Sequence, residues 1–235
     1  MSGWAQKRFW KTATAVRVPG GYSVQLDGRS LKTPAKADFV VPTHAMASAA
    51  ADEWQAQEGI VDPVAMPTTR SANAAIDKVT LQHAEVAALI ADYGGTDLIC
   101  YRAEGPESLI ARQAEVWNPL RDWSAEALGA PLITVSGVIF TPQPPASLRV
   151  FDDCVGALSA FELAGLHDLV SISGSLVIGL AVTKSFLSPQ EAWRRARIDE
   201  QWQLEHWGDD EEASRMSDAK CSAFLHAARF FQMSR

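Results

Sequence analysis

The sequence predicts an α+β fold in which a small β-rich domain is followed by a larger helical domain. Residues 7–42 hold short alternating apolar segments separated by Gly and Pro, whereas the rest of the chain shows helical periodicity. With 235 residues, 47% hydrophobic and 21% charged, the chain has globular composition and the length for one or two domains. We place the two domains at residues 1–60 and 61–235.

The N-terminal domain begins with strands. Tyr22, Val24 and Leu26 alternate with polar residues, which is the period of a half-buried strand. Asp27 and Gly28 form a two-residue turn, after which the chain returns through Leu31. Residues 39–42 are expected to form a further short strand with a proline at its edge.

Helices are expected from residue 43 onward. Thr43 is placed to cap a helix that runs to about Gln57 and ends before Gly59. Residues 60–69 are expected to form a loop, and Pro106 suits the first turn of a helix that contains Pro119. The expected helices span residues 43–57, 72–90, 106–123, 146–160, 166–183, 189–207 and 209–233.

Three segments of the sequence allow more than one interpretation. Residues 97–101 and 132–140 fit either strands or connecting segments. The apolar run at 169–182 is 14 residues long, too short to span a bilayer, and we interpret it as a buried helix. Within it, Ser171, Ser175 and Gly179 recur every four residues, a spacing that lets helix backbones approach closely.

Charge is unevenly distributed along the chain. The net charge of −7 disfavours nucleic acid as a partner, because phosphate binding requires clustered Lys and Arg. The first 36 residues nevertheless carry seven Lys and Arg against Asp27 alone, and the stretch from Asp199 to Glu212 carries seven carboxylates and no Lys or Arg. These stretches are either solvated faces or surfaces that bind partners.

The cysteines and the N-terminus indicate a reducing compartment. Cys100, Cys154 and Cys221 are widely spaced, form no CxxC motif, and are expected to be small buried side chains. The N-terminus has no apolar secretory segment, and no stable membrane insertion is expected. These features suit a protein of a reducing compartment.

A search for catalytic motifs is negative. The sequence has no P-loop, GxGxxG, HExxH or GxSxG motif, and its five histidines lack the spacing of metal ligands. His83 lies on an apolar helical face and is interpreted as a core residue. A metal site from Glu205, His206, Asp209 and Asp210 would need one helical face to continue across Gly208. We predict no enzyme activity, cofactor or metal.

One helical face combines aromatic and acidic residues. Trp193, Glu200, Leu204 and Trp207 share a face of the expected 189–207 helix. Glu200 is either paired within the fold by Arg197, since an unpaired buried carboxylate is costly, or part of an open face that binds a partner.

Tryptophan is abundant, with eight residues in the chain. Trp4 and Trp10 lie in a basic segment and either contact a membrane or partner or pack on the strands. Trp54 shares a helical face with Met46 and Ala50, so it suits either the core or an interface.

Several short phrases, in order along nearly the whole chain, resemble a known family. That family comprises the mitochondrial and alpha-proteobacterial assembly chaperones that bind the alpha subunit of the ATP synthase catalytic head. The phrases are RFWK at 8–11, LDGR at 26–29, LKTP at 31–34, EWQAQ at 53–57, DP at 62–63, MPTTR at 66–70, TDLICYR at 96–102, RQAEVWNPL at 112–120, SGSL at 173–176, DEQWQ at 199–203 and WG at 207–208.

The resemblance implies a fold and a function. The fold would be a small α+β domain joined to a larger orthogonal helical bundle. The protein would have no catalytic activity and no nucleotide, and would shield the alpha-subunit surface that a beta subunit later covers. This chain would be a bacterial cytoplasmic member of the family, monomeric when free, and its eukaryotic relatives would act in the mitochondrial matrix. The residues expected to contact the alpha subunit through charge and aromatic anchoring are Glu200, Asp199, Trp202, Trp207, Trp54 and Glu53.

Two other functions remain open from the sequence. An unrecognised enzyme would use Asp199, Glu200 and Glu205 as acid and base, and would need a deep pocket with a raised carboxylate pKa. A membrane-docking scaffold would use the basic, Trp-bearing residues 1–11.

Overall fold

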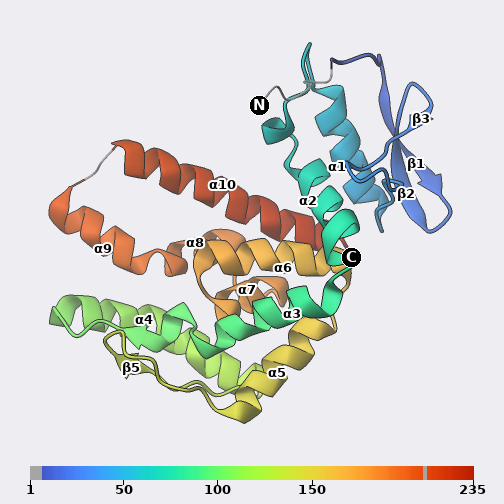
Figure 1. Ribbon diagram of the computed structural model, residues 1–235. Coiled ribbons are helices and arrows are strands. Elements are labelled where there is room, and N and C mark those ends of the chain that lie inside the picture. The colour runs from blue at the N-terminus through green and yellow to red at the C-terminus, as the bar shows by residue number, and fades with distance from the viewer. Residues whose placement is uncertain (1–6, 209–210) are drawn as a thin grey trace. The chain divides into compact units, whose positions relative to one another are not determined.

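The computed structural model describes residues 7–208 and 211–235, and the chain divides into two compact units (Figure 1). Unit 1 comprises residues 1–83, 159–165 and 229–235, and unit 2 comprises residues 84–158 and 166–228. The α+β class is confirmed, because the three-stranded sheet lies near the N-terminus and helices dominate the rest. Our domain boundary at residue 60 stays a prediction.

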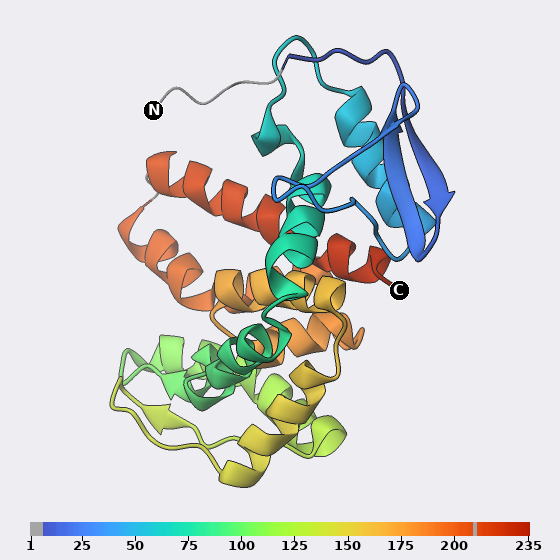
Figure 2. The same ribbon diagram turned by 45° about the vertical axis from the view of Figure 1, so that its right-hand side comes forward.

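Unit 1 is built on a small antiparallel sheet with one helix against it. Strands β1 (Ala13–Val18), β2 (Gly21–Leu26) and β3 (Arg29–Ser30) pair in that order, and Ala15 faces Val24 in the β1–β2 register. Helix α1 (His44–Gln55) packs against β1 and β2, as Figure 2 shows. Val24, Leu26, Phe39, Met46 and Ala50 are buried in the core of this unit.

Two local predictions in unit 1 are confirmed. Asp27 and Gly28 both have positive φ, 48° and 80°, as a tight hairpin turn between β2 and β3 requires. The Thr43 hydroxyl accepts the backbone N–H of Met46 at 3.2 Å and caps α1. The expected strand at 39–42 is wrong except for a single bridge between Val41 and Tyr22.

The prediction for residues 60–90 was partly wrong. The loop ends early, because a 3₁₀ turn forms at Pro63–Ala65 and helix α2 (Pro67–Ala74) begins with a proline. The single helix expected at 72–90 is interrupted: α2 continues into a π-helical turn at Ala75–Val79, and α3 (His83–Ala91) starts only after a break. A π turn inserts an extra residue, so it shifts the helical face that periodicity alone would extrapolate.

Unit 2 is a bundle of helices. After α3 come α4 (Glu107–Trp123), α5 (Pro145–Gly156), α6 (Ala160–Ser173), α7 (Leu176–Thr183), α8 (Pro189–Ala196), α9 (Ile198–Trp207) and α10 (Glu211–Met233), with the start of α6 and the end of α10 assigned to unit 1. Pro119 lies inside α4, as expected. Every residue from Leu176 to Val182 in α7 is buried. Within residues 7–208 and 211–235, no helix is both long and apolar enough to cross a bilayer.

Two of the long helices expected in unit 2, at 166–183 and at 189–207, are broken in the structure. The 166–183 helix is interrupted at Gly174, which has φ +74°, and Ser175 then caps α7. Ser171 is exposed and lies on α6, so the expected row of small residues does not form. Gly179 does pack closely against α6, since a Cβ at this position would lie 2.8 Å from Val170 Cγ2.

The ambiguous segments pair with each other. Strand β4 (Tyr101–Arg102) and strand β5 (Val135–Ser136) form a short parallel ladder, and neither pairs with the N-terminal sheet. Residues 98–100 form a 3₁₀ turn, and Cys100 within it is buried as expected, which raises the pKa of its thiol to about 12.

Asp97 is a fully buried carboxylate at the centre of unit 2. Its side chain accepts the backbone N–H of Ile99 at 3.2 Å and that of Val177 at 2.9 Å, so it caps both the 98–100 turn and the start of α7. The backbone N–H of Leu98 also donates to the carbonyl of Gly174 at 3.1 Å. Burial raises the pKa of Asp97 from 3.8 to about 6.

This raised pKa predicts the pH dependence of stability. Because the folded-state pKa lies above the unfolded value, Asp97 contributes most to the free energy of unfolding at low pH, and this contribution falls as pH rises through 6. Relative to Asp97→Asn, which does not titrate, the wild type should gain about 1 kcal/mol between pH 7 and pH 5. Urea denaturation of both proteins at pH 5, 6 and 7 measures this gain. A constant difference across that range would contradict the assignment.

Candidate functional site

Helix α9 carries four of the six predicted contact residues. It begins at Ile198, after Arg197 leaves helical geometry with φ −113° and ψ 21°. This break is a correction to the single 189–207 helix, and it separates Trp193 from the face we assigned to it. Trp193 lies on α8, is 9% exposed and packs against Phe224 of α10 at 5.7 Å between ring centroids. It is therefore a core residue.

The exposed part of α9 is aromatic and acidic. Trp207 is 74% exposed and Leu204 is 41% exposed, while Glu200 and Trp202 are half-buried. The Trp202 ring stacks on His206 at 3.9 Å and meets Trp207 edge-on at 6.0 Å. We call the side chains of Glu200, Trp202, Leu204, Glu205 and Trp207 the α9 surface.

The carboxylates of α9 have partners within unit 2. The Arg197 guanidinium donates to Glu200 at 2.5 Å, which confirms the pairing considered from the sequence. Arg112 of α4 donates twice to Glu205, at 2.9 and 2.7 Å, and this hydrogen bonding lowers the pKa of Glu205. Helices α4 and α9 are labelled in Figure 1. The Arg112–Glu205 pair could not be predicted from local patterns, because its members are 93 residues apart.

Asp199 is half-buried and is held in a polar network that joins α9 to α4. The side-chain amide of Gln113, a residue 2% exposed on α4, donates to Asp199 at 2.7 Å. The Gln113 amide oxygen accepts the backbone N–H of Ala103 at 2.8 Å, and its carbonyl accepts a bond from Arg102 at 3.1 Å. Gln113 therefore ties strand β4, helix α4 and helix α9 together.

Glu53 and Trp54 are engaged inside unit 1. The Glu53 carboxylate accepts the backbone N–H groups of Thr68 and Thr69 at 2.6 and 2.8 Å, so it caps α2, whose Met66 supplies no side-chain cap. Trp54 is half-buried, and Trp10 packs edge-on against it at 5.1 Å.

Trp10 itself is 3% exposed and donates its indole N–H to the Trp54 carbonyl at 3.3 Å. Trp10 therefore packs on unit 1 and is not a free anchor. Trp4, the other tryptophan of the basic N-terminal segment, lies outside the described residues.

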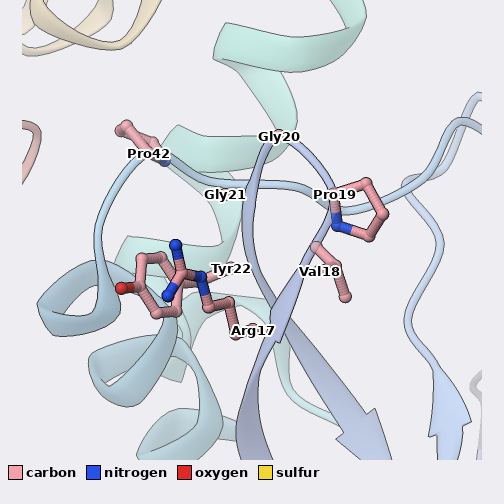
Figure 3. Close-up of a pocket in the computed structure, with 7 residues that line it drawn as sticks. All are labelled: Arg17, Val18, Pro19, Gly20, Gly21, Tyr22 and Pro42. Carbon is pink, nitrogen blue, oxygen red and sulfur yellow. The ribbon is translucent and has the colours of Figure 1, made fainter.

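A hollow of about 650 Å³ lies at the turn between β1 and β2 in unit 1 (Figure 3). Its lining includes Arg17 and Tyr22, which face each other across the two strands, together with Pro42. None of the predicted contact residues lines it.

The metal site considered from the sequence, with Glu205, His206, Asp209 and Asp210 as ligands, has no support in the described residues. Asp209 and Asp210 lie outside those residues, and Glu205 is bound to Arg112. Among the described residues, no group of three His, Cys, Asp or Glu side chains is placed to hold a metal ion.

The buried network predicts a stability effect at Gln113. Gln113→Ala removes the bonds to Ala103 and Asp199 and leaves both groups unpaired, so the free energy of unfolding should fall by about 1–3 kcal/mol. Glu115→Ala, at an exposed position of the same helix, should change it by less than about 0.5 kcal/mol. Denaturant unfolding measures both values, and equal stabilities of the two variants would contradict a structural role for the network.

Comparisons with known proteins agree with this architecture. Residues 7–125 match the family described as ATP12 chaperone protein. Protein atp12, mitochondrial, from Schizosaccharomyces pombe is 27% identical over 220 residues, which cover 88% of this chain and 75% of that protein.

Solved structures are also similar. The crystal structure of Atp12 from Paracoccus denitrificans has a TM-score of 0.94 and 47% identity, covering 97% of this chain and 98% of that chain. A putative chaperone from Agrobacterium tumefaciens has a TM-score of 0.92 and 39% identity, covering 97% of this chain and 86% of that one. The family expected from the ordered sequence phrases is thus confirmed, and this chain belongs to the ATP12 chaperone family.

Proposed function

We propose that this protein is an assembly chaperone of the ATP synthase that binds the unassembled alpha subunit through the α9 surface. The observation that carries the proposal is the 74% exposure of Trp207, which shares one face of α9 with the exposed Leu204 and with the Glu200 carboxylate. Large aromatic side chains dominate the energetics of protein interfaces, and one left in water is typical of a contact site.

The charge of unit 2 supports a basic client. Its sequence carries twenty Asp and Glu against ten Lys and Arg, a formal charge of −10, whereas unit 1 carries eight against eleven, or +3. A surface of one sign speeds the encounter with a client of the opposite sign and disfavours like-charged partners. The α9 surface therefore suits a client with apolar groups bordered by Lys and Arg.

A holding function also fits the mixed chemistry of the surface. An unassembled subunit of an obligate oligomer exposes apolar interface that promotes aggregation. A chaperone that covers this interface must later release it, and interfaces with polar rims are more readily reversible than continuous apolar ones. We further propose that the free protein is monomeric, acts in the bacterial cytoplasm and has no catalytic activity.

The rival enzymatic function has weaker support. Acid–base catalysis by Asp199, Glu200 and Glu205 would call for a carboxylate with a raised pKa. The pKa of Glu205 is instead lowered by Arg112, and Asp199 and Glu200 are bound to Gln113 and Arg197. These contacts favour a binding role for the cluster.

Co-purification with separately expressed ATP synthase subunits tests the proposal. Wild type should retain the alpha subunit and not the beta subunit. Trp207→Ala should weaken retention at least tenfold, because an interface hot spot contributes about 2 kcal/mol or more. Glu200→Lys should also weaken retention of the alpha subunit, because it replaces a negative charge on the α9 surface with a positive one.

The matched controls are Leu81→Ala and Glu85→Lys, which change exposed residues outside the α9 surface and should retain the alpha subunit as wild type does. Circular dichroism verifies that each variant is folded. A folded wild type that retains neither subunit would refute the proposed function.

A further inference from the structure

The segment from Ile133 to Gln143 is a loop closed at its base by one side chain. The Gln143 amide oxygen accepts the backbone N–H of Ile133 at 2.8 Å, and its NH₂ group donates to the Ile133 carbonyl at 2.9 Å. Gln143 is 5% exposed, so this pair of hydrogen bonds is shielded from water. It joins residues ten positions apart and fixes both ends of the loop.

Further contacts make the loop base rigid. Within it, β5 pairs with β4, and the backbone N–H of Gly137 donates to the Arg102 carbonyl at 2.8 Å. Pro142, Pro144 and Pro145 fix the backbone φ on the return side. The loop tip is therefore presented from an ordered base.

The tip of this loop is apolar and exposed. Val138, Ile139 and Phe140 are consecutive and are 92%, 80% and 60% exposed. No hydrogen bond from any described residue reaches their backbone groups. We call these three residues the apolar tip. Three consecutive large apolar side chains in water are unfavourable for an isolated protein and indicate a contact with another molecule.

The surroundings of the apolar tip select the kind of molecule it contacts. The Glu104 side chain lies beside Gly137, Glu107 is exposed at the start of α4, and unit 2 as a whole has a charge of −10. An anionic membrane or a nucleic acid would be repelled by this field. An apolar protein surface bordered by Lys and Arg matches it.

We propose that the apolar tip is a second docking element, which binds an apolar, basic-bordered surface of the same client as the α9 surface. This inference rests on the proposed function. A preordered tip loses little conformational entropy on binding, so its three apolar side chains add to the affinity. Gln143 is then a positioning residue, which acts through the loop geometry and does not touch the client.

Retention of the purified alpha subunit by immobilised chaperone variants tests this proposal. The double variant Ile139→Ser with Phe140→Ser should weaken retention about tenfold or more, since each removes an exposed apolar contact. Gln143→Ala, which leaves the apolar tip intact, should weaken it several-fold. Leu89→Ser, which changes a 65% exposed residue of α3, is the matched control and should retain the client as wild type does.

A photo-crosslinking amino acid placed at position 139 gives an independent readout, with the same group at position 89 as its control. Capture of the alpha subunit from position 139, and not from position 89, is the expected result. Capture of a second copy of this chain, or binding of the wild type to anionic vesicles that the double variant loses, would overturn the inference.

Failure of the inference and failure of the proposed function give different results. If wild type retains the alpha subunit and the folded double variant retains it equally, the apolar tip is not a docking element although the chaperone function stands. If wild type does not retain the alpha subunit at all, the proposed function itself fails, and the inference fails with it.

Discussion

Unit 2 is organised around the carboxylate of Asp97, which reaches two backbone segments that are far apart in the sequence. It caps the turn at residues 98–100 and the first turn of α7, a helix whose residues from Leu176 to Val182 are all buried. Backbone amides buried without acceptors are costly, and here one side chain satisfies amides in both segments. Asp97, together with the backbone bond from Leu98 to Gly174, therefore links α7 to the turn that precedes β4, and the apolar residues of α7 complete the core around these contacts.

The same segment leads from the core to the surface. Arg102 lies two residues after the turn that Asp97 caps and donates to the Ile99 carbonyl of that turn at 2.7 Å. Its guanidinium also donates to the carbonyl of Gln113 and lies 5.3 Å from the centroid of the Trp117 ring. Gln113 in turn holds Asp199 in the first turn of α9. A continuous series of hydrogen bonds thus links the buried carboxylate to the helix that carries Trp207. The predicted contact residue Asp199 belongs to this support and is half-buried, as Glu200 and Trp202 are, whereas Trp207 is exposed.

Local chemistry could be predicted from the sequence, and long-range chemistry could not. The Asp27–Gly28 turn, the Thr43 cap and the Arg197–Glu200 pair each involve residues within three positions of one another. The break at Gly174 was missed because apolar residues continue on both sides of it, so the periodicity resembles one helix. The cap that Glu53 provides to a helix beginning fourteen positions later also lies beyond what local patterns predict. Residues 132–140 were ambiguous because their β-branched residues suit a strand, whereas the prolines on both sides also suit a connecting segment.

The ion pairs of α9 have a consequence for how tightly any client could be held. Glu200 and Glu205 already have their own cations, Arg197 and Arg112, and both pairs are partly exposed to solvent. An incoming Lys or Arg must displace these internal competitors, so the energy it gains is only the difference between two similar contacts. The chain thus carries its own counterions at the place where a basic client would bind. These internal ion pairs would leave the α9 surface selective for a positively charged client but would lower its affinity for that client. A client held with low affinity would exchange without a separate release step.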